Sequence, residues 1–587
     1  MKKITLLLSA KARKSALSKL RELGVLQIQH VQPPQSEDLD RIHTELNQVE
    51  TALRIVGSEG KDEKRIPPDE VPGYVQRILE LSEKKSRCTQ ALDGLRETFR
   101  WYESWGSVSR ASVQNLKEAG IWVRFYLTDK SGLKKIPAET PIHVARVERG
   151  AVRLAFFAMS EEDRLDSKED QMPDVDYEEL KEEIHDLEVE IRQVDDEQAG
   201  LSHIRGALLR YEEHLKKRIE FSEALHSMGV EEHFVYLQGF CPEEDTSKIR
   251  RAADEEDWAT IIEDPDDPND VPTLIRNPKW LRIVNPLFQF MGTLPGYEEY
   301  DISFWFLLFM SVFFGIILGD AGYGIVMVGL TLYASRKAGK HIPREPFRLM
   351  TVFGVATVVW GVISGNWFGF ARIAQIPFLN RMVIDRIDSF AEDNSAFMTY
   401  LCFIIAVIHL SIAHGIRAFK IINSPRALGE VGWICMLWAL FFLAGNLVLG
   451  NQLPPFTLLL LLLGFLLALV FTNFQKNFFK GMGATLINLP LNVIGSFSDI
   501  VSYIRLFAVS SASVAVATSF NDMALGGGIH TVLGGFIAAI ILFFGHSLNI
   551  VLGMMSVIVH GVRLNMLEFS NHINMQWAGK SYKPFKE

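Results

Sequence analysis

The stretch SFSDIVSYIRLFAVSSASVAVATSF, residues 496–520, is long enough to cross a lipid bilayer and carries an arginine near its middle. Nearly every residue around Arg505 is apolar or small, and about 20 such residues span the hydrocarbon core as a helix. A fixed positive charge at that depth costs at least about 2.5–3.5 kcal/mol on insertion scales. The stretch therefore predicts a helical membrane protein with either a polar path or a charged partner at Arg505.

Working outward from this stretch, the 587 residues divide into two halves of different composition. Charged residues are frequent from position 1 to about 290, whereas apolar runs with short polar loops dominate from about 303 onward. The net charge of −10 comes with both signs interspersed, so no basic face indicates a nucleic-acid partner. The length and the change in composition predict at least two domains.

The start of the chain, MKKITLLLSAKARKS, imitates a secretory signal, but Lys11 and Arg13 follow a short apolar run with no cleavage site. We interpret Ile4–Leu8 as a buried strand that precedes a helix. The four cysteines are widely separated, which fits neither a disulfide framework nor a metal site. No motif indicates a cofactor.

Two segments far apart in the first half both read as strand, helix, strand. They are KITLLLSAKARKSALSKLRELGVLQIQHV (3–31) and HFVYLQGFCPEEDTSKIRRAADEEDWATIIE (233–263). We predict that residues 1–35 and 230–265 together form one small α/β lobe, called proximal. Strand-rich sequence at 111–165, including GIWVRFYL and AVRLAFFAM, predicts a second, distal lobe.

Heptad spacing links the two lobes, through residues 38–106 and 175–225. Apolar residues of the return arm follow one 4-3-4-3 register: Leu180, Ile184, Leu187, Ile191, Val194, Leu201, Leu208, Leu215 and Ile219. This pattern predicts an antiparallel coiled-coil rod. Polar residues interrupt both seams, so two amphipathic helices on a globular core remain an alternative. The predicted α/β two-lobed cytoplasmic domain covers residues 1–290.

The only GKS tripeptide lies in WAGKSYK, residues 577–583. The phosphate-binding loop requires a glycine five residues before Gly579, where this chain has Asn574, and a preceding strand. We therefore expect no ATP hydrolysis by this chain itself, and we predict neither a catalytic residue nor a metal ligand.

Residues 300–587 predict a membrane α-helical bundle of about eight transmembrane helices. The predicted spans are 303–319, 321–335, 349–370, 398–416, 430–449, 456–473, 484–520 and 530–569. The first two are short and meet at GDAGYG, which predicts a tight hairpin. The last two are so long that they must tilt, kink or project from the bilayer.

Basic loops predict the orientation of these spans. Several lysine and arginine residues occur in each of the loops 335–348, 417–427 and 474–480 and at the C-terminus. The loops 450–455 and 521–528 contain neither. Because basic loops stay in the cytoplasm, we expect both termini there. The loop 371–397 is an exception, with its arginines balanced by acidic residues such as Glu392 and Asp393.

Polar residues form a seam on each of the last two predicted spans. The seventh carries Ser498, Ser502 and Arg505 among small residues. The stripe on the eighth is spaced 3-4-3-4-3, which places six residues on one helix face: His546, Asn549, Gly553, Ser556, His560 and Arg563. Asp499 and Glu568 lie near enough to pair with the arginines. Helix packing, interhelical hydrogen bonds or a structural arginine would explain parts of both seams without a transport function.

These segments resemble a known family, the a subunit (subunit I) of V-type and archaeal-type rotary ATPases, also called V/A-ATPases. SYIRLFAVSSA (502–512) and GHSLNIVLGMMSVIVHGVRLNMLEF (545–569) resemble its arginine-bearing spans. FGIILGDAGYG (314–324), GNWFG (365–369) and VIHLSIAHGI (407–416) resemble further family segments. The resemblance covers essentially the whole chain.

The resemblance implies a stator that forms two offset half-channels for H⁺ or Na⁺ beside a rotor ring of small proteolipid subunits. Each ring subunit carries one mid-membrane carboxylate, and Arg505 matches the essential arginine that meets it. Arg563 matches a second arginine, while Glu568, His560 and Asp320 match positions less securely tied to ion passage. The implied partners are the ring, peripheral-stalk subunits, the central-stalk cap subunit and the lipid bilayer. The implied location is a bacterial or archaeal plasma membrane.

The chain departs from the family pattern at Ser513, Leu491 and Gly553, where other members carry histidine or acidic residues. Asp499 and the histidines of the last span are candidate replacements. The complete set of predicted ion-translocation residues is Arg505, Arg563, Glu568, His560, Asp499, Asp320, Ser502, Ser556, Asn549 and His546. The ion, the ring size and the direction of ATP turnover are left open.

Two other functions fit parts of the sequence. One is a secondary ion transporter or channel with a coiled-coil regulatory domain, although the spans show no inverted repeat. The other is a membrane scaffold in which both arginines are locked in packing.

Overall fold

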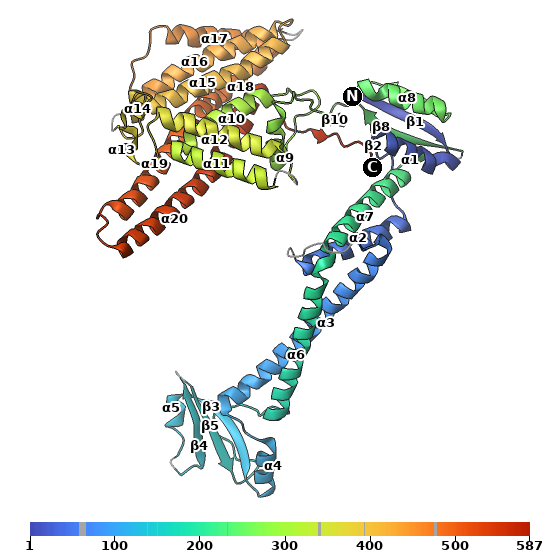
Figure 1. Ribbon diagram of the computed structural model, residues 1–587, viewed down its shortest axis with the longest axis vertical. Helices are drawn as coiled ribbons and strands as arrows, with labels where there is room; N and C mark the ends of the chain where they lie inside the picture. Colours follow the sequence, from blue (N-terminus) through green and yellow to red (C-terminus); the bar gives the residue numbers. More distant parts are fainter. Residues whose placement is uncertain are drawn as a thin grey trace. The chain divides into compact units, whose positions relative to one another are not determined.

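The computed structural model describes residues 1–587 except 58–65, 138, 149–150, 232, 339–341, 392–393, 475–477 and 587. They form two units (Figure 1). The α/β unit comprises Lys2–Glu263 and Pro584–Glu587, and the helical unit comprises Met1 and Asp264–Lys583. Lys340 and Lys476 of the predicted basic loops, and the acidic Glu392 and Asp393, lie outside the described residues.

The proximal end of the α/β unit is an antiparallel sheet in the order β2-β8-β1-β9. These strands are β1 (Lys2–Ser9), β2 (Gln27–Gln29), β8 (Phe234–Cys241) and β9 (Ala259–Glu263), with the short β7 (Gly229–Val230) beside β8. Helices α1 (Arg13–Leu23) and α8 (Thr246–Glu255) belong to the same lobe. Alternate residues of β1, Ile4, Leu6 and Leu8, are buried, as expected for a strand with one covered face.

The last residues of the chain complete this lobe. Phe585 is 3% exposed and belongs to the core that contains the buried residues of β1. Its backbone N–H donates to the carbonyl oxygen of Leu26 at 2.8 Å, and its ring lies 6.2 Å from that of Phe221. This contact was not predictable from the sequence, because the four residues PFKE have no periodic pattern.

A long helical rod leads from the proximal lobe (Figure 1). It consists of α2 (Glu37–Val56), α3 (Val71–Trp105), α6 (Tyr177–Gly200) and α7 (Arg205–His226), with a 3₁₀ turn, Leu201–Ile204, between the last two. Helix α2 packs on α7, and α3 packs on α6. Ion pairs join Arg77 to Glu197 at 2.7 Å and Arg96 to Glu188 at 2.6 Å, so the two arms run antiparallel.

A second sheet closes the far end of the rod, in the antiparallel order β4-β5-β3-β6. Its strands are β3 (Trp122–Thr128), β4 (Ile142–Glu148), β5 (Ala151–Ala158) and β6 (Lys168–Glu169), accompanied by α4 (Arg110–Glu118) and α5 (Lys130–Leu133). Trp105, at the end of α3, packs against Phe125 with ring centroids 5.1 Å apart. Its indole N–H donates to Asp170 at 2.8 Å. The α/β, two-lobed fold with a rod is confirmed.

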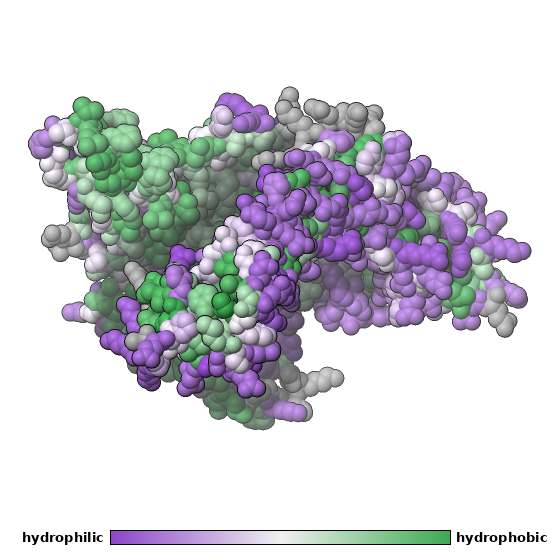
Figure 2. All heavy atoms as spheres, turned by 90° about the horizontal axis from the view of Figure 1, so that it is seen from below, coloured by the Kyte–Doolittle hydropathy of each residue, from purple (hydrophilic) through white to green (hydrophobic). Residues whose placement is uncertain are grey.

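The helical unit contains five helices long and apolar enough to cross a membrane, judged by length and composition over the described residues. They are α12 (Glu345–Ile363), α15 (Ser395–Lys420), α16 (Arg426–Leu449), Phe479–Leu525 and Val532–Ile573. The shorter apolar helices α10 (Ser303–Leu318) and α17 (Thr457–Phe471) occupy two more predicted spans, and α11 (Ala321–Ala338) occupies the remaining one. Figure 2 shows broad hydrophobic surface on this part of the chain.

The two shortest predicted spans meet in a tight hairpin. Gly319 ends α10 with φ +58°, the left-handed conformation that glycine adopts without strain. The next residue, Asp320, begins α11 by accepting the backbone N–H of Tyr323 at 3.1 Å. The GKS segment predicted not to bind nucleotide contributes β11 (Lys580–Ser581), which pairs with β10 (Pro272–Thr273).

Candidate functional site

A break in the longest helix places Arg505. Helix α18 (Phe478–Ser502) and helix α19 (Ile504–Leu525) are joined at Tyr503, where the chain makes tight i to i+3 hydrogen bonds. The Tyr503 ring is fully buried and its hydroxyl lies 2.8 Å from Nδ1 of His409. This anchor holds the first turn of α19, so Arg505 begins from a fixed backbone position.

The last long helix changes its winding where its charged residues lie. Helix α20 (Val532–Ser556) continues as two π-helical segments, Val557–Gly561 and Leu564–Phe569, and then α21 (Ser570–Ile573). A π turn holds more residues than an α turn, and such segments occur often at functional sites. Beyond Ser556 the face that packs inward therefore passes to Val557, Gly561, Leu564 and Glu568.

The predicted six-residue stripe is consequently wrong beyond Ser556. Asn549 and Gly553 are buried, but Arg563 lies on the exposed side, with its side chain 55% exposed. The prediction assumed an uninterrupted 3.6-residue repeat, which the π segments shift. His560 is half-buried, and its Nδ1 has no hydrogen-bond partner among the described residues.

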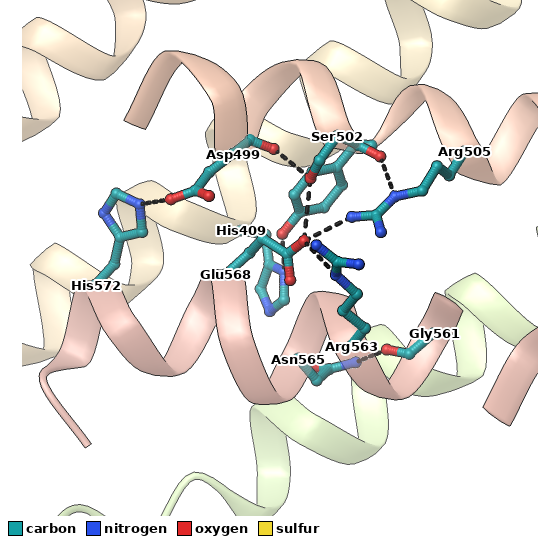
Figure 3. Close-up of polar contacts among 10 residues, drawn as sticks. His409, Asp499, Ser502, Arg505, Gly561, Arg563, Asn565, Glu568 and His572 are labelled. Atoms are coloured by element: carbon teal, nitrogen blue, oxygen red, sulfur yellow. Dashed lines mark hydrogen bonds and ion pairs between the residues drawn. The ribbon is translucent and has the colours of Figure 1, made fainter. Parts of the chain in front are cut away.

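Glu568 joins the two arginines (Figure 3). Its Oε1 accepts a hydrogen bond from Nη2 of Arg505 at 2.6 Å and lies 3.6 Å from Nε of Arg563. The hydroxyl of Ser502 donates to the same oxygen at 3.2 Å, while Nε of Arg505 donates to the carbonyl oxygen of Ser502 at 2.8 Å. Four predicted residues are thus brought together at one carboxylate oxygen.

Asp499, by contrast, contacts neither arginine in the described structure. Its carboxylate lies 3.1 Å from Nε2 of His572, so the expected pairing with an arginine is wrong for Asp499 and correct for Glu568. Asp499 lies six residues before Arg505, on α18, and its side chain contacts His572 instead of the arginines.

His572 begins a chain of buried polar contacts that the sequence did not single out. Its Nδ1 lies 2.9 Å from Nε2 of His414, whose Nδ1 lies 2.7 Å from Glu430. Arg417 pairs with the same glutamate at 3.1 Å. A cavity of about 500 Å³ opens beside these groups and Asp499. His414 lies in VIHLSIAHGI, a segment already noted for its resemblance, but its contacts with His572 and Glu430 were not predicted.

A second polar network lies among α11, α19 and α20. The amide of Asn549 donates to the hydroxyl of Tyr323 at 3.0 Å and to the carbonyl oxygen of Ser513 at 2.9 Å. The Tyr323 hydroxyl lies 2.7 Å from Nδ1 of His546, and Nε2 of His546 lies 3.1 Å from Asn521. Sequence reasoning found Asn549 and His546 but not Tyr323 or Asn521.

Asp320 and Ser556 do not reach the arginines in the described structure. The Asp320 carboxylate is buried and accepts the backbone N–H groups of Tyr323 and Gly369, at 3.1 and 3.2 Å. It therefore joins the α10–α11 hairpin to the GNWFG segment. Ser556 is half-buried on α20.

Aromatic rings separate the two polar networks. The imidazole of His409 lies between Phe309 and Phe569, with ring centroids 3.8 and 4.2 Å away, and close to the ring of Tyr503. This layer is fully buried at His409 and Tyr503. No group of three His, Cys, Asp or Glu side chains is placed to hold a metal ion anywhere in the described part of the chain.

Taken together, the long apolar helices and the arginine site define a multi-pass membrane protein with an α/β unit. No family model matches the chain. It is 30% identical to V-type ATP synthase subunit I of Borreliella burgdorferi over 611 residues, covering 100% of this chain and 99% of that protein. It is also 30% identical to V-type ATP synthase subunit I 1 of Treponema pallidum over 633 residues, with 100% and 99% covered.

An archaeal relative, A-type ATP synthase subunit I of Methanocaldococcus jannaschii, is 26% identical over 594 residues, covering 88% of this chain and 82% of that protein. A solved structure of the cytoplasmic N-terminal domain of subunit I, homolog of subunit a, of V-ATPase covers 45% of this chain and 100% of that one. Its identity of 17% and TM-score of 0.26 are too low to carry an argument. The full-length relatives are sufficient: this chain belongs to the subunit I family of V-type and A-type ATP synthases.

Proposed function

We propose that this chain is the stator subunit that moves H⁺ or Na⁺ past the rotor ring of a V/A-type rotary ATPase. The observation that carries the proposal is the pair of arginines around Glu568, partly exposed and flanked by two polar networks with an aromatic layer between them. A simple scaffold gains nothing from two partly exposed guanidinium groups at membrane depth, because each costs insertion energy.

The chemistry of the rotor carboxylate explains why arginine is placed there. A carboxyl group facing lipid must be neutral, since an isolated charge in an apolar medium is very costly. Beside a guanidinium group the ionised form is favoured, so the carboxyl group releases its proton or Na⁺ on arrival. The arginine also blocks direct passage of a cation between the two sides.

The cavity beside Asp499 fits the half-channel that opens to the cytoplasm. It is lined by Asp499, His572, His414, Glu430 and Arg417, together with amide and hydroxyl side chains. Helix α15 ends at Lys420 and α16 begins at Arg426 close to this cavity, and basic helix ends face the cytoplasm. Water in the cavity would bring an ion to within one or two helical turns of Arg505.

A smaller cavity of about 200 Å³ fits the opposite half-channel. Ser510 and Ser511 of α19 line it, with Asp388 and Asn394 from the loop before α15. These serines follow Arg505 by five and six residues, a rise of about 8–9 Å along the helix. The two cavities therefore lie on opposite sides of Arg505 along the same broken helix, as offset half-channels require. The network of Asn549 and His546 lies further along α19, beside Ser513 and Asn521.

The α/β unit supplies the mechanical part of the proposal. A rotor exerts torque on its stator, and an antiparallel helical rod with a lobe at each end suits attachment to peripheral-stalk subunits and to the central-stalk cap. ATP is bound and hydrolysed, or made, on other subunits, so this chain is a non-catalytic subunit. The membrane is a bacterial or archaeal plasma membrane, with both termini in the cytoplasm.

Replacing Arg505 by alanine in the assembled complex tests the proposal. We expect ATP-driven ion uptake into vesicles, measured with and without Na⁺, to be abolished while the ring and the ATP-hydrolysing head still copurify. The matched control is Arg344→Ala, which removes an exposed arginine just before α12 and should leave uptake unchanged. Uptake that survives Arg505→Ala would refute the role, and a chain that never copurifies with a ring would favour a transporter or scaffold.

A further inference from the structure

Glu568 is placed unusually for a residue of a structural ion pair. Its side chain is 5% exposed, and a single oxygen, Oε1, serves Arg505, Arg563 and Ser502. The other oxygen, Oε2, is buried and has no hydrogen-bond partner among the described residues. Figure 3 shows the two guanidinium groups approaching this carboxylate from different helices, with contacts at only one of its oxygens.

The arginines keep donors for another acceptor. Arg505 uses Nε and Nη2, but its Nη1 makes no hydrogen bond to the described residues. Arg563 contacts Glu568 only through an ion pair of 3.6 Å, which is too long for a hydrogen bond. A guanidinium group has five N–H donors, and a buried structural pair normally satisfies them. These two groups are 22% and 55% exposed at their side chains, so a partner can reach them.

The net charge of the cluster follows directly from its members. Two arginines and one glutamate sum to one positive charge, and Asp499 lies outside this cluster because its carboxylate contacts His572 instead of either arginine. One incoming carboxylate would neutralise the cluster, and a second would leave it negative. In a site of low dielectric constant such a charge mismatch is strongly disfavoured.

We propose that Glu568 is the stator's internal counter-ion, which limits the arginine site to one ionised rotor carboxylate at a time. The proposal rests on the proposed function and assigns Glu568 a positioning role, because it acts through the two arginines. When a rotor carboxyl group arrives, its proton or Na⁺ leaves through a half-channel and its oxygens accept the unused N–H groups. Glu568 retains its contacts with Ser502 and Arg563. Arg505 can therefore turn to the rotor carboxylate without leaving the Glu568 carboxylate unpaired.

Several other ionisable groups surround Glu568 and belong in any account of its pH dependence. Tyr503 precedes Arg505 on the broken helix, and His409 of α15 packs on Phe569. The remaining groups come from the last helix and from α18: His560, His572 and Asp499. None of them is changed in the variants below, so a shift common to all variants would point to these groups.

The test uses charge changes of opposite sign in the assembled complex, with the pH profile of ATP-driven ion uptake as the readout. Glu568→Gln raises the cluster to two positive charges, which holds the rotor carboxylate ionised to lower pH. The profile should move to lower pH by about one to three units, the usual effect of an added opposite charge at this distance. Arg563→Gln should move the profile in the opposite direction.

The double variant Glu568→Gln with Arg563→Gln restores one positive charge and should restore a profile close to that of the unmodified protein. Glu568→Asp keeps the charge of the cluster and should also keep the profile. Asp522→Asn removes a negative charge from the far end of α19 and controls for charge loss as such. If Glu568→Gln does not assemble, Arg563→Gln alone tests the proposal. A shift of its pH profile to higher pH supports the proposal, and no shift or a shift to lower pH overturns it.

The proposal would be overturned if the pH profile of ion uptake did not shift in Glu568→Gln or in Arg563→Gln. It would also be overturned if the profile of the double variant shifted further than that of either single variant. These outcomes are distinct from failure of the proposed function, which predicts only that Arg505→Ala abolishes uptake. If Arg505→Ala abolishes uptake and the charge variants show no shift, the stator role stands and the counter-ion role falls. If Arg505→Ala still transports, both fall.

Discussion

The rod of the α/β unit and the arginine site of the helical unit use the same kinds of ion pair in opposite surroundings. In the rod, Arg77–Glu197 and Lys84–Glu190 join the two arms, and each of the four side chains is between 39% and 51% exposed. In the helical unit, Glu568 and Glu430 are almost fully buried and each faces two cationic or imidazole partners. The pairs of the rod are open to solvent, and the two buried glutamates are not.

The difference teaches where charge contributes to structure and where it contributes to function. Exposed pairs contribute little stability because water screens them and ordering two long side chains costs entropy. Burying unequal numbers of positive and negative charges is costly, and it persists where function requires it. The rod pairs set register between antiparallel helices, while the unequal cluster at Glu568 fits a site that awaits a further negative charge.

The largest expected effect on stability comes from Glu430. Glu430→Ala removes the buried carboxylate that pairs with His414 and Arg417, and breaking such a pair costs about 3–5 kcal/mol. We expect a clear fall in the melting temperature of the detergent-solubilised complex. Glu197→Ala in the rod should leave the melting temperature unchanged. Equal falls for the two variants would remove the contrast between the regions.

The second-largest expected effect on stability comes from Phe585, in the C-terminal tail that packs on the α/β unit. Phe585→Ala should destabilise the proximal lobe by about 3 kcal/mol, because it empties a core position beside Phe221. Proteolysis of the full-length chain at increasing urea concentration measures this loss. Phe234→Ala truncates a side chain that is 52% exposed and serves as the control. A tail variant as resistant as the control would mean that Phe585 does not contribute to the core.

A smaller effect is expected where the distal lobe joins the rod. Trp105→Phe keeps an aromatic ring against the edge of Phe125 but removes the hydrogen bond to Asp170, at a cost of about 1 kcal/mol. The urea midpoint of the same proteolysis assay should fall slightly. Asp170→Asn retains an acceptor oxygen, so its urea midpoint should fall less than that of Asp170→Ala. The reverse order would show that charge, and not the hydrogen bond, matters there.

The smallest expected effect concerns the chemical reactivity of the two cysteines of the α/β unit, Cys88 and Cys241. Burial raises the pKa of the Cys241 thiol to about 12, and burial also raises the pKa of Cys88 in the rod. At pH 8 a thiol of pKa 12 is ionised in only about one molecule in ten thousand, and the thiolate is the reactive form. Maleimide should therefore label neither cysteine in the folded α/β unit and both after unfolding, as mass spectrometry of peptides would detect. Rapid native labelling of Cys241 would contradict its burial.

The fold followed from the sequence wherever a pattern repeats. The alternation in β1, the heptads between Leu180 and Ile219 and the long apolar runs each depend on local periodicity, which burial imposes directly. Phe585 illustrates the opposite case. A single aromatic residue at a chain end packs on a lobe more than 300 residues earlier in sequence, and no periodicity records that contact.

The charges of the candidate site and the pairing of Glu568 were predictable from the sequence, but the pairing of Asp499 was not. Arg505, Arg563 and Glu568 stood out because charge is rare in apolar spans, and the structure brings all three together. The partner of Asp499 was missed because His572 lies beyond the predicted span 530–569, in the short helix α21. The π segments likewise moved Arg563 away from the face that a regular helix predicts.

The most direct measurement of the central claim is a cross-link between Arg505→Cys and a cysteine placed at the carboxylate position of one rotor subunit. Mild oxidation of the assembled complex in its membrane should join the two chains through a disulfide, and a reductant should separate them again. If an intact complex gives no cross-link at Arg505→Cys under any nucleotide condition, the rotor carboxylate does not pass this arginine and the account is wrong.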